Sequence, residues 1–349
     1  MNKSKKIFQC TENQETNIRK KFSIISFVCS LFVIYIHALN LGIYGIDENS
    51  VGTGHITYVI ETYAGYITGI AVPMFYFISA ILFFRTFELR NLLIKWKTRV
   101  FTILIPYLIW CCLHYLYFVV CTKLDVNGNM VYYEKVELSV SAWIKALWIE
   151  QFSVLGFLKL LMVFILLSPI IWMILKDHCK KVPTGFWALI VLLLLYKRME
   201  ILHIRGISDY LVGSYIGINC QEYIKKKSPA VSIISLIFIL FVLLTSFRYW
   251  NFIVMMMFFV AIWYAMDLID LSEINLPWWT QITFFTYVAH FALLETVEKI
   301  VLVIGGKNPA WALADFVFMP LVIEALLILV AYFLRNKLPT IWGVITGHR

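Results

Sequence analysis

The feature that most constrains this chain is a series of long apolar runs, about ten in number, each of roughly 20 residues and so long enough to cross a bilayer as a helix. Hydrophobic residues make up 61% of the 349 residues and charged residues 15%, against ~45–50% and ~25% in ordinary soluble domains. A soluble protein of this length cannot bury so much apolar surface. The sequence therefore predicts an all-α, polytopic transmembrane helical bundle of about ten spans, and it excludes soluble enzymes and nucleic-acid-binding proteins.

The apolar runs divide the chain into three parts. Residues 1–21 are polar and basic, 22–334 form the membrane domain, and 335–349 form a short tail. The expected spans are 22–41, 62–84, 100–120, 154–175, 184–196, 208–222, 230–247, 252–266, 279–297 and 311–334.

The positive charges indicate how the chain is oriented. With the N-terminus inside, 20 of the 30 Lys and Arg residues fall in inside segments and nine in outside segments, while Lys159 lies within a span. Cytoplasmic loops of membrane proteins carry an excess of Lys and Arg. We therefore expect both termini to be cytoplasmic.

The first span has a polar face that ends in a histidine. Ser26, Ser30 and Val33 precede His37 by eleven, seven and four residues, so the four side chains share one side of a helix. Such a face is expected to point into the bundle. A neutral imidazole there could accept a proton from a hydroxyl substrate. The alternative is a histidine that only hydrogen-bonds a neighbouring helix.

The ninth and last spans carry further ionisable groups at membrane depth. His290 follows Thr286 and Thr283 on one helix face, where it would orient a substrate, polarise a carbonyl or simply pack. Glu324 lies near the middle of the last span, either protonated or paired with a cation such as Lys159. Intramembrane ionisable residues are costly, and each is a functional candidate for that reason. His114 and Asp315 are weaker candidates.

A basic run follows the second span. It contains five cations with one acid, Glu88, and it suits anionic lipid headgroups or the phosphates of a cytosolic donor such as a coenzyme A ester. These cations are Arg85, Arg90, Lys95, Lys97 and Arg99. The seven cysteines show no disulfide framework and no metal-ligand spacing, so no metal is expected.

Four motifs, taken in order, resemble acyltransferase family 3, a family of bacterial integral membrane proteins that acylate surface carbohydrates. The motifs are Ile24 to His37-Ala38; Val72-Pro-Met-Phe-Tyr-Phe-Ile-Ser79 with the later Ile105-Pro106-Tyr107-Leu-Ile-Trp110; Leu155-Gly-Phe-Leu-Lys159 with Ser168-Pro169; and Phe285-Thr-Tyr287-Val-Ala-His290. The resemblance runs over residues 22–334.

This resemblance implies an O-acyltransferase in the bacterial plasma membrane. His37 and His290 would be its catalytic residues, and Arg99, Lys97, Ser79 and Lys159 would contact the donor. The donor would be an acyl-CoA, typically acetyl-CoA, used as a co-substrate with no bound cofactor. The acceptor would be a surface polysaccharide or a lipid-linked glycan, with membrane lipids as the surroundings and no nucleic-acid partner.

Three positions depart from the family pattern. Ser26 stands where Arg or Lys is usual, Ala80 replaces the glycine after the motif serine, and Gly156 replaces a tryptophan. A family member with impaired catalysis is therefore one alternative. Another is a carrier that flips or exports glycans, although the chain shows no paired broken helices. A membrane-bound O-acyltransferase of the unrelated family and a glycan polymerase are further alternatives.

Overall fold

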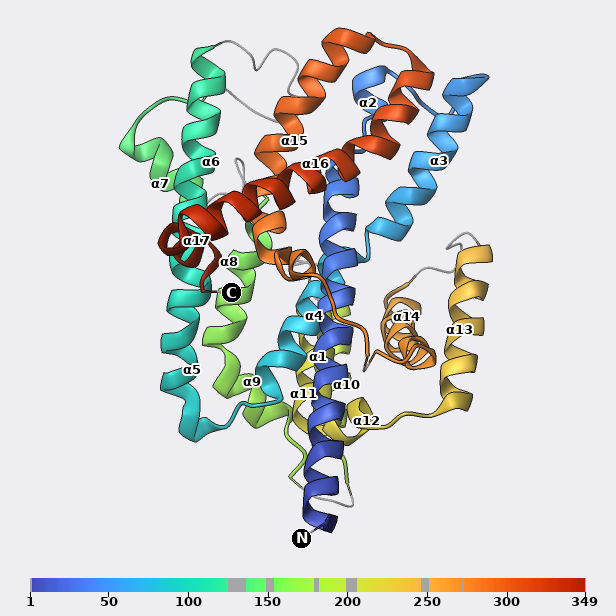
Figure 1. The fold of residues 1–349 in the computed structure, drawn as a ribbon, viewed down its shortest axis with the longest axis vertical. Coiled ribbons are helices and arrows are strands. Elements are labelled where there is room, and N and C mark those ends of the chain that lie inside the picture. Colours follow the sequence, from blue (N-terminus) through green and yellow to red (C-terminus); the bar gives the residue numbers. More distant parts are fainter. Residues whose placement is uncertain are drawn as a thin grey trace. The chain divides into compact units, whose positions relative to one another are not determined.

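A computed structural model describes residues 2–124, 136–148, 154–178, 182–198, 206–245, 251–271 and 273–348, with side chains from Gln14 onward. Every regular element in these ranges is a helix (Figure 1), which confirms the predicted all-α class.

The α-helices are α1 (Asn2–His37), α2 (Leu41–Tyr44), α3 (Thr53–Thr68), α4 (Ala71–Phe84), α5 (Leu92–Arg99), α6 (Ile105–Lys123), α7 (Val140–Trp148), α8 (Gly156–Leu166), α9 (Ser168–Leu175), α10 (Thr184–Arg198), α11 (Ile207–Asn219), α12 (Gln221–Lys225), α13 (Pro229–Leu244), α14 (Phe252–Ala265), α15 (Thr283–Gly305), α16 (Pro309–Lys337) and α17 (Pro339–Thr346). A π-helical turn, Val100–Leu104, joins α5 to α6.

Each of the ten apolar runs lies on one or more of these helices, but not all the helices are long enough to span a bilayer. Among the described residues, four helical stretches have sufficient length and apolarity: Gln14–Tyr44, Thr53–Phe84, Leu89–Lys123 and Pro309–Lys337. The pair α8 and α9, broken near Leu167, makes a fifth if it counts as one span. The total of ten spans and the cytoplasmic location of both termini therefore stay predictions.

The chain forms two compact units. Unit 1 contains residues 1–29, 70–92 and 167–280, and unit 2 contains residues 30–69, 93–166 and 281–349. The division cuts through α1, which contributes Asn2–Cys29 to unit 1 and Ser30–His37 to unit 2. Each unit is described by itself below.

Unit 1 is built on a close packing of α11 against α4. Gly213 lies so near α4 that a Cβ atom added there would come within 2.4 Å of the carbonyl oxygen of Phe77 and 3.0 Å of the Ala80 side chain. Gly217, one turn later, approaches Ile81 in the same way, at 3.0 Å from its carbonyl oxygen. Small residues four apart are the usual device that lets membrane helices approach closely. The small side chain of Ala80 belongs to this contact.

A buried ion pair in unit 1 joins α1 to the 3₁₀ turn that follows α14. Lys21 Nζ is 2.7 Å from Asp267 Oδ1, and each side chain is only 5% exposed. Lys21 also donates to the Trp263 carbonyl oxygen at 3.1 Å and lies 4.6 Å from the centre of that indole ring. From the sequence, Lys21 was predicted to end the polar segment before the first span. In the structure α1 runs without a break from Asn2, and Lys21 is inside the apolar stretch.

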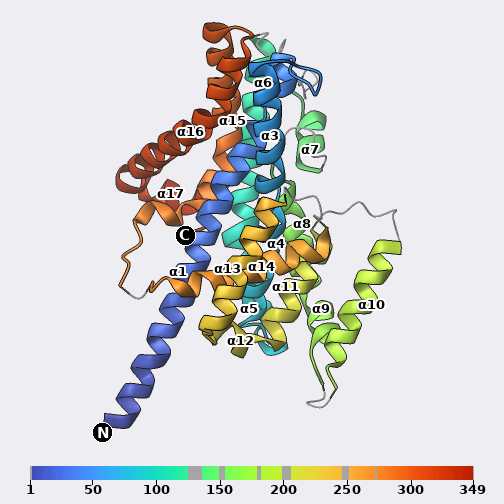
Figure 2. The same cartoon turned by 90° about the vertical axis from the view of Figure 1, so that its right-hand side faces the viewer.

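In unit 2, α15 packs beside α16, as both views show (Figures 1 and 2). The short helix α17 packs against α6 and α16, so the tail 335–349 belongs to this unit. Trp342 of α17 is 9% exposed and its ring centre lies 5.1 Å from that of Phe285. Trp110 of α6 donates its indole N–H to the Ile345 carbonyl oxygen at 3.0 Å. These contacts fix the helices that carry the histidines.

Candidate active site

Two histidines predicted from separate motifs come together in unit 2. His37 is the last residue of α1, and its ring centre lies 5.3 Å from that of His290 in α15, with the two rings tilted by 40°. Phe291 approaches His37 edge-on, at 5.5 Å between ring centres. His290 is 0% exposed whereas His37 is only half-buried, so His37 is the member of the pair that a substrate can reach.

The hydrogen bonds of His290 determine which of its nitrogens carries the proton. Nδ1 lies 2.8 Å from the Tyr287 carbonyl oxygen and 3.1 Å from that of Thr286. Carbonyl oxygens only accept hydrogen bonds, so Nδ1 must be the protonated nitrogen. Among the described residues Nε2 has no partner, and it is buried. In the neutral ring Nε2 therefore carries a lone pair and can accept a proton or a hydrogen bond.

A third histidine supports the same stretch of α15. His114 of α6 is 2% exposed, and its Nε2 lies 2.9 Å from the Val288 carbonyl oxygen, to which it donates. Its charge would be felt by His290. The sequence treated His114 as a weaker candidate. Its contact with α15 makes it part of the cluster around His290, although it binds backbone rather than the other imidazoles.

Glu324 of α16 accepts a hydrogen bond from a hydroxyl. Thr286 Oγ1 donates to Glu324 Oε1 at 3.3 Å, and both residues are buried. The two alternatives from the sequence, a protonated carboxyl group or a pair with a cation such as Lys159, stay predictions. Thr286 thus contributes its hydroxyl to Glu324 and its carbonyl oxygen to His290, so one residue links the carboxyl group to the histidine.

Immediately after His37 the chain enters a buried polar network. The backbone N–H of Asn40 donates to Glu61 Oε2 at 3.0 Å, and its side-chain amide donates to Asp315 Oδ2 at 3.2 Å. Tyr44 reaches the same Asp315 oxygen at 3.4 Å. Asn40 and Glu61 are each 1% exposed. Sequence analysis missed this network because it placed the start of the second span at residue 62, which left Glu61 in a loop. The spacing of Asn40, one turn beyond His37, was the available signal.

The predicted donor-binding cations lie farther along the chain. Lys97 is exposed and Arg99 half-buried, both in α5. The helical stretch Leu89–Lys123 is continuous, and fifteen residues separate Arg99 from His114, so the two lie roughly 20 Å apart along its axis at ~1.5 Å per residue. Lys159 is half-buried in α8, within electrostatic range of Cys111 on α6.

Ser26 and Ser79, the other two predicted site residues, belong to unit 1. Ser26 is half-buried on α1 and Ser79 is half-buried on α4. In the structure His37 contacts His290, and Thr286 links His290 to Glu324. The basic run and the two serines are not among these contacts. Among the described residues no group of three or more His, Cys, Asp or Glu side chains is arranged to hold a metal ion.

Fold and site together define a helical membrane protein with two adjoining histidines from different helices. The chain belongs to acyltransferase family 3: the model of that family's acyltransferase domain matches residues 24–334, nearly the whole chain and both histidines. No curated protein and no solved structure matches it in comparisons of sequence and of fold.

Proposed function

We propose that the protein is an O-acyltransferase that moves an acyl group, typically acetyl, from an acyl-CoA to a hydroxyl of a surface polysaccharide or lipid-linked glycan. Membership of the acyltransferase family supports the reaction class. The observation that carries the proposal is the contact between half-buried His37 and fully buried His290, because it provides an accessible base with a buried partner.

In this proposal His37 accepts the proton of the acceptor hydroxyl as the oxygen attacks the thioester carbonyl carbon. The C–S bond then breaks, and coenzyme A leaves as the thiolate, which takes the proton from His37 and becomes the thiol. Rings whose centres are 5.3 Å apart allow an N–H···N hydrogen bond from His37 to the bare Nε2 of His290 after a small rotation. That bond would hold one His37 nitrogen protonated and leave the other as the base.

The donor would approach along the α5–α6 stretch. The exposed ammonium of Lys97 and the guanidinium of Arg99 suit the phosphates of coenzyme A. The roughly 20 Å between Arg99 and His114 requires a donor with an extended arm, which the pantetheine part of coenzyme A supplies. Asn40, three residues after His37, brings the carboxylates of Glu61 and Asp315 into one buried network, and their oxygens would accept hydrogen bonds from the hydroxyl groups of the glycan.

Chemical analysis of the cell-surface glycan tests this proposal. Ester-linked acyl groups should disappear when the gene is deleted and return when the native gene is restored. Restoration with a His37→Ala copy, expressed at the same level, should not return them. An unchanged ester content after deletion would refute the proposal. Loss of the whole glycan, rather than of its esters, would favour the flippase or exporter alternative.

A further inference from the structure

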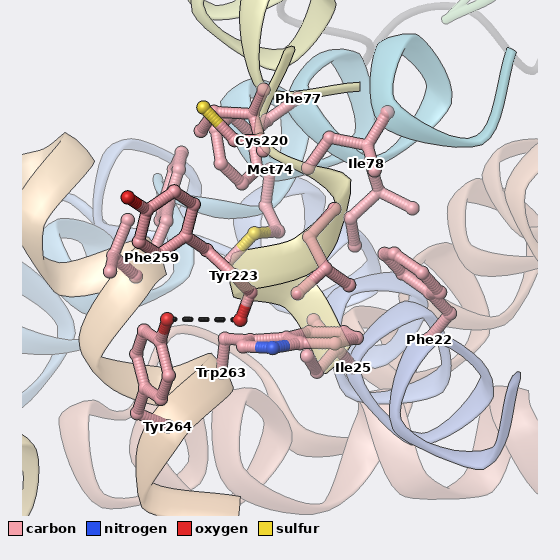
Figure 3. A pocket seen from close by; sticks show the side chains of 14 residues that line it. Phe22, Ile25, Met74, Phe77, Ile78, Cys220, Tyr223, Phe259, Trp263 and Tyr264 are labelled. Atoms are coloured by element: carbon pink, nitrogen blue, oxygen red, sulfur yellow. Dashed lines mark hydrogen bonds between the residues drawn. The ribbon is translucent and has the colours of Figure 1, made fainter. Parts of the chain in front are cut away.

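Unit 1 contains a cavity of about 230 Å³ that plays no part in the histidine chemistry. Its walls come from α1, α4, α11, α12 and α14, all within this unit (Figure 3). For comparison, a dry apolar cavity of ~150 Å³ is enough to bind benzene. By proportion, this one would take roughly nine carbon atoms of an aliphatic chain.

The walls of the cavity are almost wholly apolar. Met74 and Ile78 of α4 and Phe259 of α14 form the inner side, and each is at most 4% exposed. The outer side contains Tyr223 and Val260, which are 65% and 40% exposed. The cavity is therefore accessible from outside the unit, and an aliphatic chain entering it would leave water or lipid for a well-buried apolar surface.

Trp263 of α14 forms part of the cavity wall, and its indole N–H is itself buried. The ring itself is held by Phe22, at 4.8 Å between ring centres, and by the Lys21 ammonium above it. In Figure 3 Trp263 lies below the apolar side chains, and the nearby Tyr264 hydroxyl donates to the Tyr223 carbonyl oxygen at 3.1 Å. The Trp263 ring is therefore a fixed part of the cavity wall against which an aliphatic chain can pack.

Three lysines follow the cavity-lining residues of α12 along the chain. Lys225, Lys226 and Lys227 directly follow the lining residues Tyr223 and Ile224, and all three are exposed. Lys21, which lies over the Trp263 ring of the cavity wall, is already neutralised by Asp267. The only acid in α12 is Glu222, so the local charge stays positive. A ligand with an anionic group is therefore favoured.

We propose that this cavity is a binding site for an anionic phospholipid. One acyl chain of the lipid occupies the apolar cavity and packs against the Trp263 ring, and the lipid phosphate lies against Lys225–Lys227. The proposal concerns unit 1 alone and does not depend on the acyltransferase reaction.

Native mass spectrometry of the purified full-length chain in detergent tests this site, with dioleoyl phosphatidylglycerol and dioleoyl phosphatidylcholine as the two probes. The anionic lipid should bind at least about 10-fold more tightly, because the three exposed lysines attract the net negative charge that phosphatidylcholine lacks. Changing all three lysines to glutamine should remove that preference, whereas Lys123→Gln, an exposed cation in unit 2, should not.

A second pair of variants tests the cavity itself. Val260→Trp fills it and should weaken both lipids, whereas Val231→Trp, at an equally exposed position (40%) outside the lining, should weaken neither. The thermal unfolding midpoint checks that each variant folds. If the triple variant does not fold, Lys226→Gln takes its place. Equal binding of the two lipids by the native chain, or full retention of phosphatidylglycerol by Val260→Trp, would overturn the proposal. Displacement of bound phosphatidylglycerol by decanoyl-coenzyme A, but not by coenzyme A, would overturn it in favour of the donor's acyl chain.

Discussion

The two units use their buried polar groups in different ways. In unit 1 the buried charges of Lys21 and Asp267 neutralise each other at 2.7 Å, and among its described carboxylates Asp209 alone has a buried oxygen without a hydrogen-bond partner. In unit 2 the buried groups include atoms that have no partner among the described residues, namely His290 Nε2, His114 Nδ1, Glu324 Oε2, Glu61 Oε1 and Asp315 Oδ1. A buried charge that has its partner needs no further contact, whereas buried atoms left without partners are costly and are expected where a substrate supplies the missing contact.

This contrast predicts that substitutions in unit 2 mainly change activity, whereas substitutions in unit 1 mainly change stability. Changes at the histidines of unit 2 should remove activity and leave folding largely intact. Changes in unit 1 should lower the amount of folded protein and leave the activity of each folded molecule unchanged. The four predictions below test that separation.

The largest expected effect is that of His37→Ala. If His37 is the general base, acyl transfer should fall by about 10²–10⁴-fold, while the thermal unfolding midpoint in detergent should change little because the side chain is only half-buried. His55→Ala, an exposed histidine in the same unit, is the matched control and should keep full activity. A fully active His37→Ala protein would remove His37 from the mechanism.

Asp267→Asn should have the largest effect in unit 1. It leaves the Lys21 ammonium buried without its counter-charge, which typically costs about 3–5 kcal/mol. The unfolding midpoint should drop and expression should fall, while activity per folded molecule should be retained.

The double variant Lys21→Met/Asp267→Leu is the control for that effect. Replacing both partners by apolar residues of similar size is often neutral, so stability should recover. If the double variant is as unstable as Asp267→Asn, the pair contributes something other than charge neutralisation, and the simple description of unit 1 fails.

The sequence predicted the helical class and the two histidines because both depend on local pattern. Apolar runs specify helices at membrane length, and the spacing of Ser26, Ser30 and His37 places them on one helix face. Which helices touch is decided by contacts between distant residues. The partner of Glu324 and the burial of Lys21 could therefore not be read from spacing. Glu61 was missed because the second span was expected to begin at residue 62, directly after this carboxylate, whereas in the structure Glu61 lies within α3.

Gly213→Leu should test the packing of α11 on α4. There is no room for a side chain between Gly213 and the Phe77 carbonyl group, so we expect a loss of about 1–3 kcal/mol through overpacking and backbone displacement. Gly42→Leu is the matched control, since a Cβ atom there meets nothing within 4 Å. The measurement is the unfolding midpoint, with activity corrected for folded protein. A stable Gly213→Leu variant would show that the close helix approach is not needed.

The smallest effect is expected for Thr286→Val, which tests the link between Glu324 and His290. Valine keeps the shape of threonine and the backbone carbonyl that accepts from His290 Nδ1, but it removes the hydroxyl that donates to Glu324. Loss of that one hydrogen bond should cost about 1 kcal/mol of stability and lower kcat by a few-fold with KM unchanged. Thr286→Ser should restore both values, and Thr283→Val, half-buried one turn earlier, should change neither. A loss of kcat as large as that of His37→Ala would mean that Glu324 takes part in proton transfer itself. In that case the carboxyl group, rather than the histidine pair alone, would define the active centre of unit 2.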